Sequence, residues 1–160
     1  MSAYGEIRMT RDIDVVIELQ STDVHRFFKE FIDEYYISEE SIKRALIHDS
    51  MFNIISNNFG GKIDCIIKKR TDHAKQSFER RYQVAIGNIG YWVTTKEDLI
   101  ISKLDWARNS HSEMQIRDVA NLTMSEYNSD YVLDWIEKLV LEEIWAKVDE
   151  WKTLHSRIEN

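Results

Sequence analysis

Two aspartates separated by one residue are the first feature of this sequence that could do chemistry. Asp12 and Asp14 open the segment Asp12 to Leu19, which is rich in β-branched residues and typical of a β-strand. Because side chains alternate across a strand, both carboxylates project from one face, about 7 Å apart at Cα. Such a pair can bind Mg²⁺, which takes carboxylate oxygens together with substrate phosphates. An isolated Asp-x-Asp pair is also common at strand ends, so the pair by itself favours an interpretation without a metal.

A third carboxylate, Asp64, stands inside the apolar segment Ile63 to Ile67. A buried carboxylate without a partner is energetically costly, so Asp64 needs a metal, a partner or an exposed position. If its strand neighbours the first strand, the three acids form a site for phosphoryl transfer with two metal ions. One ion then positions a triphosphate and the other activates the attacking hydroxyl. The place of Asp64 within a strand favours this interpretation.

Lys103 is another unusual position, because it lies in the apolar stripe of a predicted helix. Its stem is expected to face the core, and its ammonium to emerge at an edge or in a cleft. There a triphosphate would suit it as a partner. Solvent exposure or an ion pair with Asp118 is the alternative, and periodicity alone favours that alternative. The apolar residues of the stripe are Leu99, Ile100, Leu104 and Ala107.

The hydrophobic pattern predicts which elements position these residues. The strand Asp12 to Leu19 is expected to start polar and become buried, and a helix capped within Ser21 to Asp23 follows it. Ser38 and Ser41 compete to cap a second, short helix. Further strands, arranged as two hairpins, are predicted over 51–56, 62–67, 82–86 and 91–93.

Beyond Thr94 the pattern is helical. Thr95 is expected to cap a helix whose first turn is acidic, as the helix dipole favours. More helices are predicted at about 112–122 and, as one or two helices, over 129–158. A strand-rich first half followed by a helical second half predicts an α+β fold.

Composition and charge restrict the class of protein. The chain has 160 residues, no proline and 43% hydrophobic residues, which excludes a proline-rich linker and favours one packed domain. We expect that domain to span 1–160, with a strand-rich core at 1–94 and a helical part at 95–160 packed on it. The net charge of −7 argues against non-specific DNA or membrane binding. The single cysteine and the absence of a signal or transmembrane segment make the cytoplasm the expected location.

One segment, residues 62–81, departs from this acidic balance. It has seven basic and three acidic residues, so a phosphate-rich acceptor such as tRNA, or a protein acceptor, could bind there. A solvated charged loop is the alternative, and charge alone slightly favours it. The basic residues are Lys62, Lys68, Lys69, Arg70, Lys75, Arg80 and Arg81.

Several blocks of the sequence together resemble a known family. They are Tyr4 to Glu18, Lys62 to Ile66, Glu97 to Arg108 and Gln115 to Leu122. These blocks are similar to small bacterial nucleotidyltransferase-fold proteins of the DNA polymerase β-like superfamily, near the AbiEii-type nucleotidyltransferase toxins. The resemblance implies a mixed β-sheet flanked by helices. It also implies metal-dependent transfer of a nucleoside monophosphate from an NTP, with Mg²⁺ or Mn²⁺, to a protein, a tRNA or a small molecule.

The resemblance also assigns roles to individual positions. Asp12 and Asp14 match the metal-binding pair, and Asp64 matches the third carboxylate. The residues expected at the nucleotide are Lys103 as a phosphate contact, Asp118 facing the same cleft, and Arg11 beside the metal-binding pair. Family members carry a Gly-Ser or Gly-Gly turn ten to fifteen residues before the first aspartate, and this sequence has none there. Either the chain begins at an internal methionine or it is a shortened member.

Two other functions stay open at this point. A catalytically inactive nucleotidyltransferase-fold module could bind a nucleotide or a protein, for example within a toxin–antitoxin pair. A structural α+β protein could instead bind another subunit through its acidic C-terminal helices. In that case Trp135, Trp145 and Trp151 are interface anchors, although such residues more often belong to the core.

Overall fold

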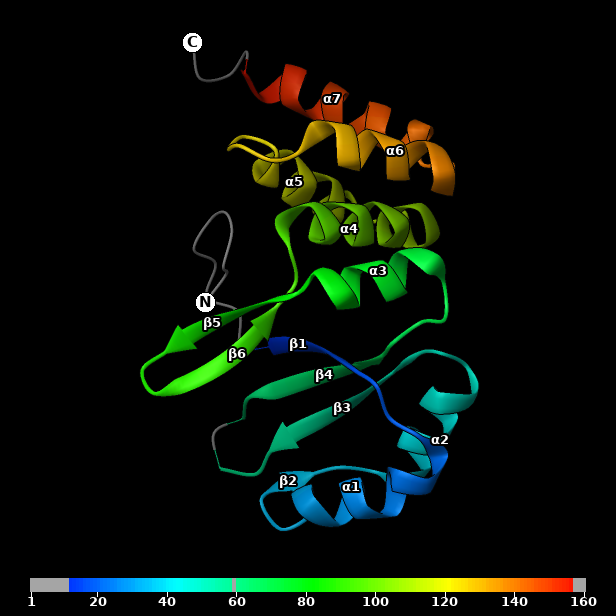
Figure 1. Cartoon of the computed structure of the whole chain (residues 1–160), viewed down its shortest axis with the longest axis vertical. Helices are drawn as coiled ribbons and strands as arrows, with labels where there is room; N and C mark the ends of the chain where they lie inside the picture. The colour runs from blue at the N-terminus through cyan, green and yellow to red at the C-terminus, as the bar shows by residue number, and fades with distance from the viewer. Residues whose placement is uncertain (1–11, 59, 157–160) are drawn as a thin grey trace. The chain divides into compact units, whose positions relative to one another are not determined.

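A computed structural model describes residues 12–58 and 60–156 (Figure 1). Helices and strands both contribute, which confirms the predicted α+β class. None of the helices in these residues is long and apolar enough to cross a membrane. The elements are β1 (Asp12–Ile17), a 3₁₀ turn (Ser21–Asp23), α1 (Val24–Phe31), β2 (Tyr35–Tyr36), α2 (Glu39–Ile47), β3 (Met51–Ser56), β4 (Lys62–Ile67), α3 (Asp72–Arg80), β5 (Tyr82–Ile86), β6 (Ile89–Val93), α4 (Lys96–Ser110), α5 (Glu113–Leu122), α6 (Ser129–Leu139) and α7 (Glu142–Ser156).

The chain divides into two compact units, with the boundary inside α3 between Lys75 and Gln76. The first unit contains the sheet of β1 to β4 with helices α1 and α2. The second contains the β5–β6 hairpin and helices α4 to α7. The hairpin that the pattern grouped with the first-half strands therefore belongs to the same unit as the C-terminal helices.

The first unit is built on a mixed four-stranded sheet in the order β1-β4-β3-β2. β1 and β4 are parallel, whereas β3 is antiparallel to both of its neighbours. Alternation puts Phe52 and Ile54 of β3 and Cys65 and Ile67 of β4 on one face. These residues form a core with side chains from the two helices, among them Val24, Ile42 and Ala45.

The first segment, Asp12 to Leu19, becomes buried only at its end, later than the sequence pattern predicts. Ile13 is 61% exposed and Val15 and Val16 are also exposed, whereas Ile17 and Leu19 are half-buried and pack against the core of the first unit. Within residues 12–58 and 60–156, β1 is an end strand of this sheet, with β4 as its neighbour, and an edge strand buries less of its surface than an interior strand. The apolar composition of β1 predicted a strand correctly, but it did not predict the strand's place at the edge.

Of the two serines predicted as alternative caps of α2, Ser38 is the one that caps the helix. The Ser38 hydroxyl accepts the backbone N–H of Ser41 at 3.3 Å, which satisfies one of the free donors of the first helical turn. The two-residue strand β2, Tyr35–Tyr36, was not predicted. It pairs with residues Ile55 and Ser56 at the end of β3, and so short a segment carries no alternation to detect.

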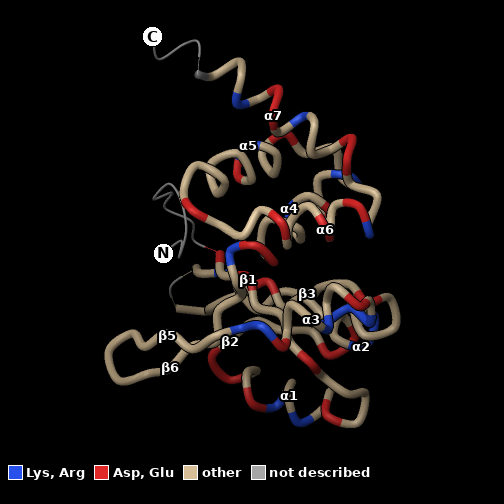
Figure 2. Tube along the Cα trace, turned by 45° about the horizontal axis from the view of Figure 1, so that its top comes forward, with Lys and Arg blue, Asp and Glu red and all other residues tan. Residues whose placement is uncertain are grey.

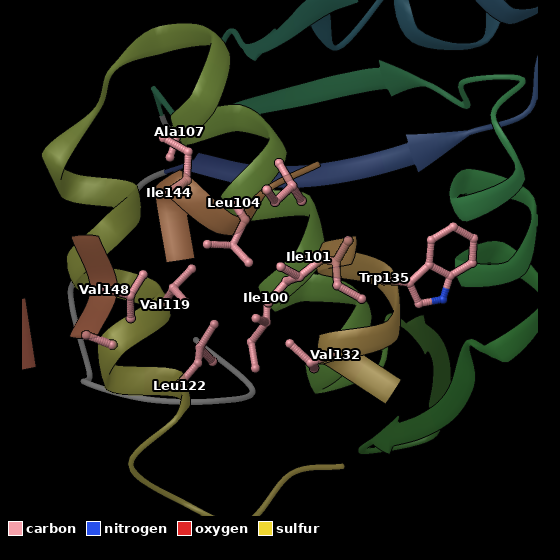
Figure 3. Packing of buried hydrophobic residues seen from close by; sticks show 13 residues of the cluster. Ile100, Ile101, Leu104, Ala107, Val119, Leu122, Val132, Trp135, Ile144 and Val148 are labelled. Carbon is pink, nitrogen blue, oxygen red and sulfur yellow. The ribbon is translucent and has the colours of Figure 1, made fainter. Parts of the chain in front are cut away.

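The second unit has its own hydrophobic core, formed by α4 to α7 (Figure 3). α4 contributes Ile100, Ile101, Leu104 and Ala107, all fully buried or nearly so. Trp135 is buried in this core, and Trp145 and Trp151 pack against it. The three tryptophans therefore act as core residues in this unit.

The last predicted stretch forms two helices, α6 and α7. Val140 adopts the left-handed backbone conformation (φ 54°) at the end of α6, and the Leu141 N–H then bonds the Ile136 carbonyl at 2.9 Å. This geometry closes a helix C-terminus. The left-handed residue is a valine, for which that conformation is strained. Because no glycine stands at this position, the sequence gives no local signal for the break between the two helices.

A buried polar network stabilises the start of α4. Asp98 is 0% exposed and accepts hydrogen bonds from Arg80 Nε at 3.0 Å, the Tyr131 hydroxyl at 2.8 Å and the Thr95 hydroxyl at 2.5 Å. The Arg80 guanidinium also lies 4.0 Å from the centre of the Tyr131 ring. Burial, and next the hydrogen bond to Asp98, raise the pKa of Tyr131 above its usual value. The Thr95 cap was predicted, whereas the network around it was not.

Candidate functional site

Asp12, Asp14 and Asp64 lie on the same face of the first sheet. In the parallel pairing of β1 with β4, Asp14 is directly opposite Asp64, and Asp12 is directly opposite Lys62. Neighbouring strands are about 4.8 Å apart, so the carboxylates occupy adjacent positions. A three-carboxylate site requires the strand of Asp64 to neighbour the strand of Asp12 and Asp14, and β4 and β1 are such neighbours.

Asp64 is buried, at 8% exposed, and both of its carboxylate oxygens are hydrogen-bonded. The side-chain amide of Asn53, opposite Asp64 on β3, donates to Oδ1. The Lys62 ammonium donates to Oδ2 at 3.1 Å. These two partners explain how a carboxylate is tolerated inside an apolar strand.

The Lys62 ammonium lies between two of the three carboxylates. Its Nζ is 3.1 Å from Asp64 Oδ2 and 3.5 Å from Asp12 Oδ2. The hydrogen bond to Asp64 is the main cause that raises the pKa of Lys62 above its usual value, with a smaller contribution from Asp12. The lysine is therefore charged at neutral pH and supplies a positive charge to this face.

The donor set on this face suits a hard divalent cation. The donors on this face are carboxylate oxygens, which Mg²⁺ and Mn²⁺ prefer. The face already stabilises one cation, the Lys62 ammonium. In the part of the chain that the structure describes, no three His, Cys, Asp or Glu side chains are placed to hold a metal together. The oxygen donors are of the type that a hard divalent cation prefers, but the carboxylates are not arranged around a common point, and the Lys62 ammonium lies between Asp12 and Asp64.

Sequence reasoning missed Lys62 and Asn53 as members of this site. Lys62 is two residues before Asp64 on the same strand, so strand alternation alone places both on one face. The charge pattern, by contrast, assigns Lys62 only to the basic segment 62–81. Asn53 could be found only from the register of the β3–β4 hairpin, in which it is opposite Asp64.

Lys103 and Asp118 lie in the second unit and bind each other. Lys103 Nζ, on α4, is 2.8 Å from Asp118 Oδ2 and 3.0 Å from Gln115 Oε1, both on α5. Gln115 is buried. This is the ion pair between neighbouring helices that the sequence offered as the alternative to a phosphate contact. The nucleotide roles of Lys103 and Asp118 stay predictions, and Arg11 lies outside the described residues.

The basic segment 62–81 does not present its charges as a continuous free stripe. Lys68 bonds Glu18 at 2.6 Å and Arg80 bonds the buried Asp98, while Arg81 lies over the Phe78 and Trp92 rings. Lys69 and Arg70 line a surface hollow together with His48, Asp49 and Thr71. The hairpin that follows has no charged side chain from Tyr82 to Val93 and is tan throughout in Figure 2, so the basic character ends with the segment.

Cys65 follows Asp64 on β4 and projects from the opposite face, into the core of the first unit. Burial is the main cause that raises the pKa of its thiol from 9.0 to about 11, and the nearby Asp64 charge adds to it. Attack on a thiol reagent requires both the thiolate and access to it. Cys65 is therefore an inert core residue.

Cys65 is expected to react with iodoacetamide at pH 8 at least about 100-fold more slowly in the folded protein than in urea, because the raised pKa removes most of the thiolate. Mass spectrometry of samples taken over time measures both rates. The chain has one cysteine, so the unfolded protein is an internal control. Labelling of the folded protein at the unfolded rate would contradict the buried position.

No protein-family model matches this chain, and no curated protein sequence matches it. The similarity to nucleotidyltransferase-fold proteins thus remains a resemblance, carried by the sequence blocks named above.

Proposed function

We propose that this protein is a nucleotidyltransferase that uses Mg²⁺ or Mn²⁺ to transfer a nucleoside monophosphate from an NTP to an acceptor hydroxyl, with release of pyrophosphate. The observation that carries the proposal is the register of β1 and β4, which sets Asp14 opposite Asp64 with Asp12 on the same face. Two carboxylates on one strand and a third on its neighbour supply oxygen ligands at adjacent positions. A phosphoryl-transfer site with metal ions requires such a set.

Each residue of this face has a proposed role. Asp12, Asp14 and Asp64 are the metal ligands, and the Asn53 amide fixes the orientation of Asp64 through its hydrogen bond to Oδ1. A bound divalent ion supplies charge neutralisation on the triphosphate and activation of the attacking hydroxyl. Positioning and electrostatic stabilisation account for most of the rate in this type of reaction. The protein therefore needs no covalent nucleophile of its own.

The acceptor is proposed to be a protein, a tRNA or a small molecule, and the reaction is proposed to take place in the cytoplasm. The basic segment 62–81 supports a phosphate-rich acceptor through Lys69 and Arg70, which line one surface hollow. The carboxylate face and this hollow are both in the first unit. Pocket shape decides the choice of nucleotide and acceptor.

A second candidate function is a catalytically inactive module that binds a nucleotide or a protein partner, such as one member of a toxin–antitoxin pair. The position of the Lys62 ammonium between Asp12 and Asp64 favours it, because an internal cation can neutralise these acids permanently. The retention of all three carboxylates favours the enzyme.

A transfer assay distinguishes the two functions. The protein is incubated with each labelled NTP, Mg²⁺ and either total tRNA or a cell extract, and the label is followed into macromolecules. The enzyme is expected to transfer label with at least one NTP, and EDTA is expected to abolish the transfer. Metal-dependent NTP binding without any transfer would support the inactive module instead.

A further inference from the structure

We infer that Lys62 is a resident counter-cation of the carboxylate face, and that a divalent ion must displace its ammonium in order to bind there. The inference rests on the proposed function, since it concerns the same three carboxylates. It adds a competition between the protein's own cation and the metal. Lys62 would then set the metal affinity of the site by competing with the ion, without binding the ion itself.

The strand register places the Lys62 side chain beside the carboxylates for which it would compete with the metal. Lys62 is opposite Asp12 in the β1–β4 register and two residues before Asp64 on β4. Its side chain therefore leaves the sheet on the carboxylate face, where Nζ lies within 3.5 Å of two carboxylates. A metal ion bound between Asp12 and Asp64 would take the place of this ammonium, which lies against Oδ2 of both carboxylates.

The burial of Asp64 explains why a cation is needed there at all times. Without Lys62, the hydrogen-bond partner that remains for the Asp64 carboxylate is the neutral Asn53 amide. A buried carboxylate that loses its counter-charge is strongly destabilised. The ammonium therefore satisfies Asp64 in the metal-free protein, and a divalent ion can take over the same task.

Lys62 is also able to leave. Its side chain is partly exposed, and a lysine ammonium is carried on a flexible four-carbon stem. The ammonium can therefore move into solvent while the strands that hold the carboxylates stay in place. Lys43 offers a matched comparison, because it pairs at 2.7 Å with Glu39 on α2 of the same unit, away from the carboxylate face.

The test is Mn²⁺ binding to the full chain, measured from the electron paramagnetic resonance signal of free Mn²⁺. Lys62→Met is expected to lower the Kd for Mn²⁺ about ten-fold relative to the wild-type protein, the size of one lost charge-assisted contact. Lys43→Met is expected to leave the Kd unchanged. Adding Asp64→Asn to Lys62→Met is expected to remove the gain.

Thermal unfolding gives a second readout that does not depend on activity. Without metal, Lys62→Met is expected to melt at a lower temperature than the wild-type protein, because Asp64 has lost its counter-charge. Saturating Mn²⁺ is expected to raise the melting temperature of Lys62→Met more than that of the wild-type protein. Lys62→Gln serves as a second variant if the methionine variant does not fold.

The outcomes separate the inference from the proposed function. Equal or weaker Mn²⁺ binding by both Lys62 variants, with binding by the wild-type protein intact, overturns the inference alone. A complete absence of Mn²⁺ binding in all the proteins overturns both the inference and the metal-dependent function.

Discussion

Asp14→Asn is expected to lower the proposed nucleotidyl transfer by about 10²–10³-fold, because the proposal makes Asp14 a metal ligand and the substitution removes its charge. Asp14 is the residue directly opposite Asp64, and asparagine keeps its size. β1 is exposed at this position, so the free energy of unfolding should change by less than about 1 kcal/mol. The initial rate of label transfer and a urea denaturation curve measure the two effects separately.

Glu18→Gln is the matched control for this substitution. Glu18 follows β1 directly, is exposed, and pairs with Lys68, so it carries the same change of charge a few residues from the carboxylate face. Transfer by this variant should equal that of the wild-type protein. An Asp14→Asn protein as active as the Glu18→Gln protein would show that the aspartate pair is not a metal ligand set.

Asp98→Ala is expected to lower the free energy of unfolding by about 2–4 kcal/mol, because it removes a buried, charged hydrogen-bond acceptor, while the partly exposed Arg80 keeps Glu97 nearby. Asp98 is fully buried and accepts hydrogen bonds from Arg80, Thr95 and Tyr131. The substitution leaves their donors without this acceptor and opens a small cavity beside α4. Urea unfolding followed by circular dichroism measures the loss.

Asp130→Ala provides the comparison for this prediction. Asp130 precedes Tyr131 in the first turn of α6 and is exposed, so its loss removes a favourable interaction with the helix dipole of no more than about 1 kcal/mol. A similar small effect for Asp98→Ala would mean that the network around Asp98 does not stabilise the second unit.

Local signals in the sequence predicted much of the fold. The β3–β4 hairpin has the predicted strand bounds, Met51–Ser56 and Lys62–Ile67, because both segments are rich in β-branched residues and enclose a glycine-containing turn. Thr95 caps α4 as expected, with the Asp98 N–H bonded to its hydroxyl at 3.2 Å. Such features depend on residues three or four positions apart, which a sequence displays directly.

Other features depend on partners distant in the sequence. The network around Asp98 joins Arg80 and Tyr131, which come from α3 and α6, and no local pattern relates these two residues. The exposure of β1 follows from its place at the sheet edge, which only the strand order reveals. For the candidate site, the sequence predicted the three acids, while the Asn53 partner required the strand register.

Equilibrium nucleotide binding tests the central claim most directly, because it does not require the acceptor. Each of the four common NTPs is titrated into the full chain by calorimetry, with Mg²⁺ or with EDTA, for the wild-type and Asp14→Asn proteins. The proposed function predicts that at least one NTP binds the wild-type protein with Mg²⁺, and that EDTA or Asp14→Asn abolishes this binding. Binding that is equally strong in EDTA, or no binding of any NTP, would contradict it.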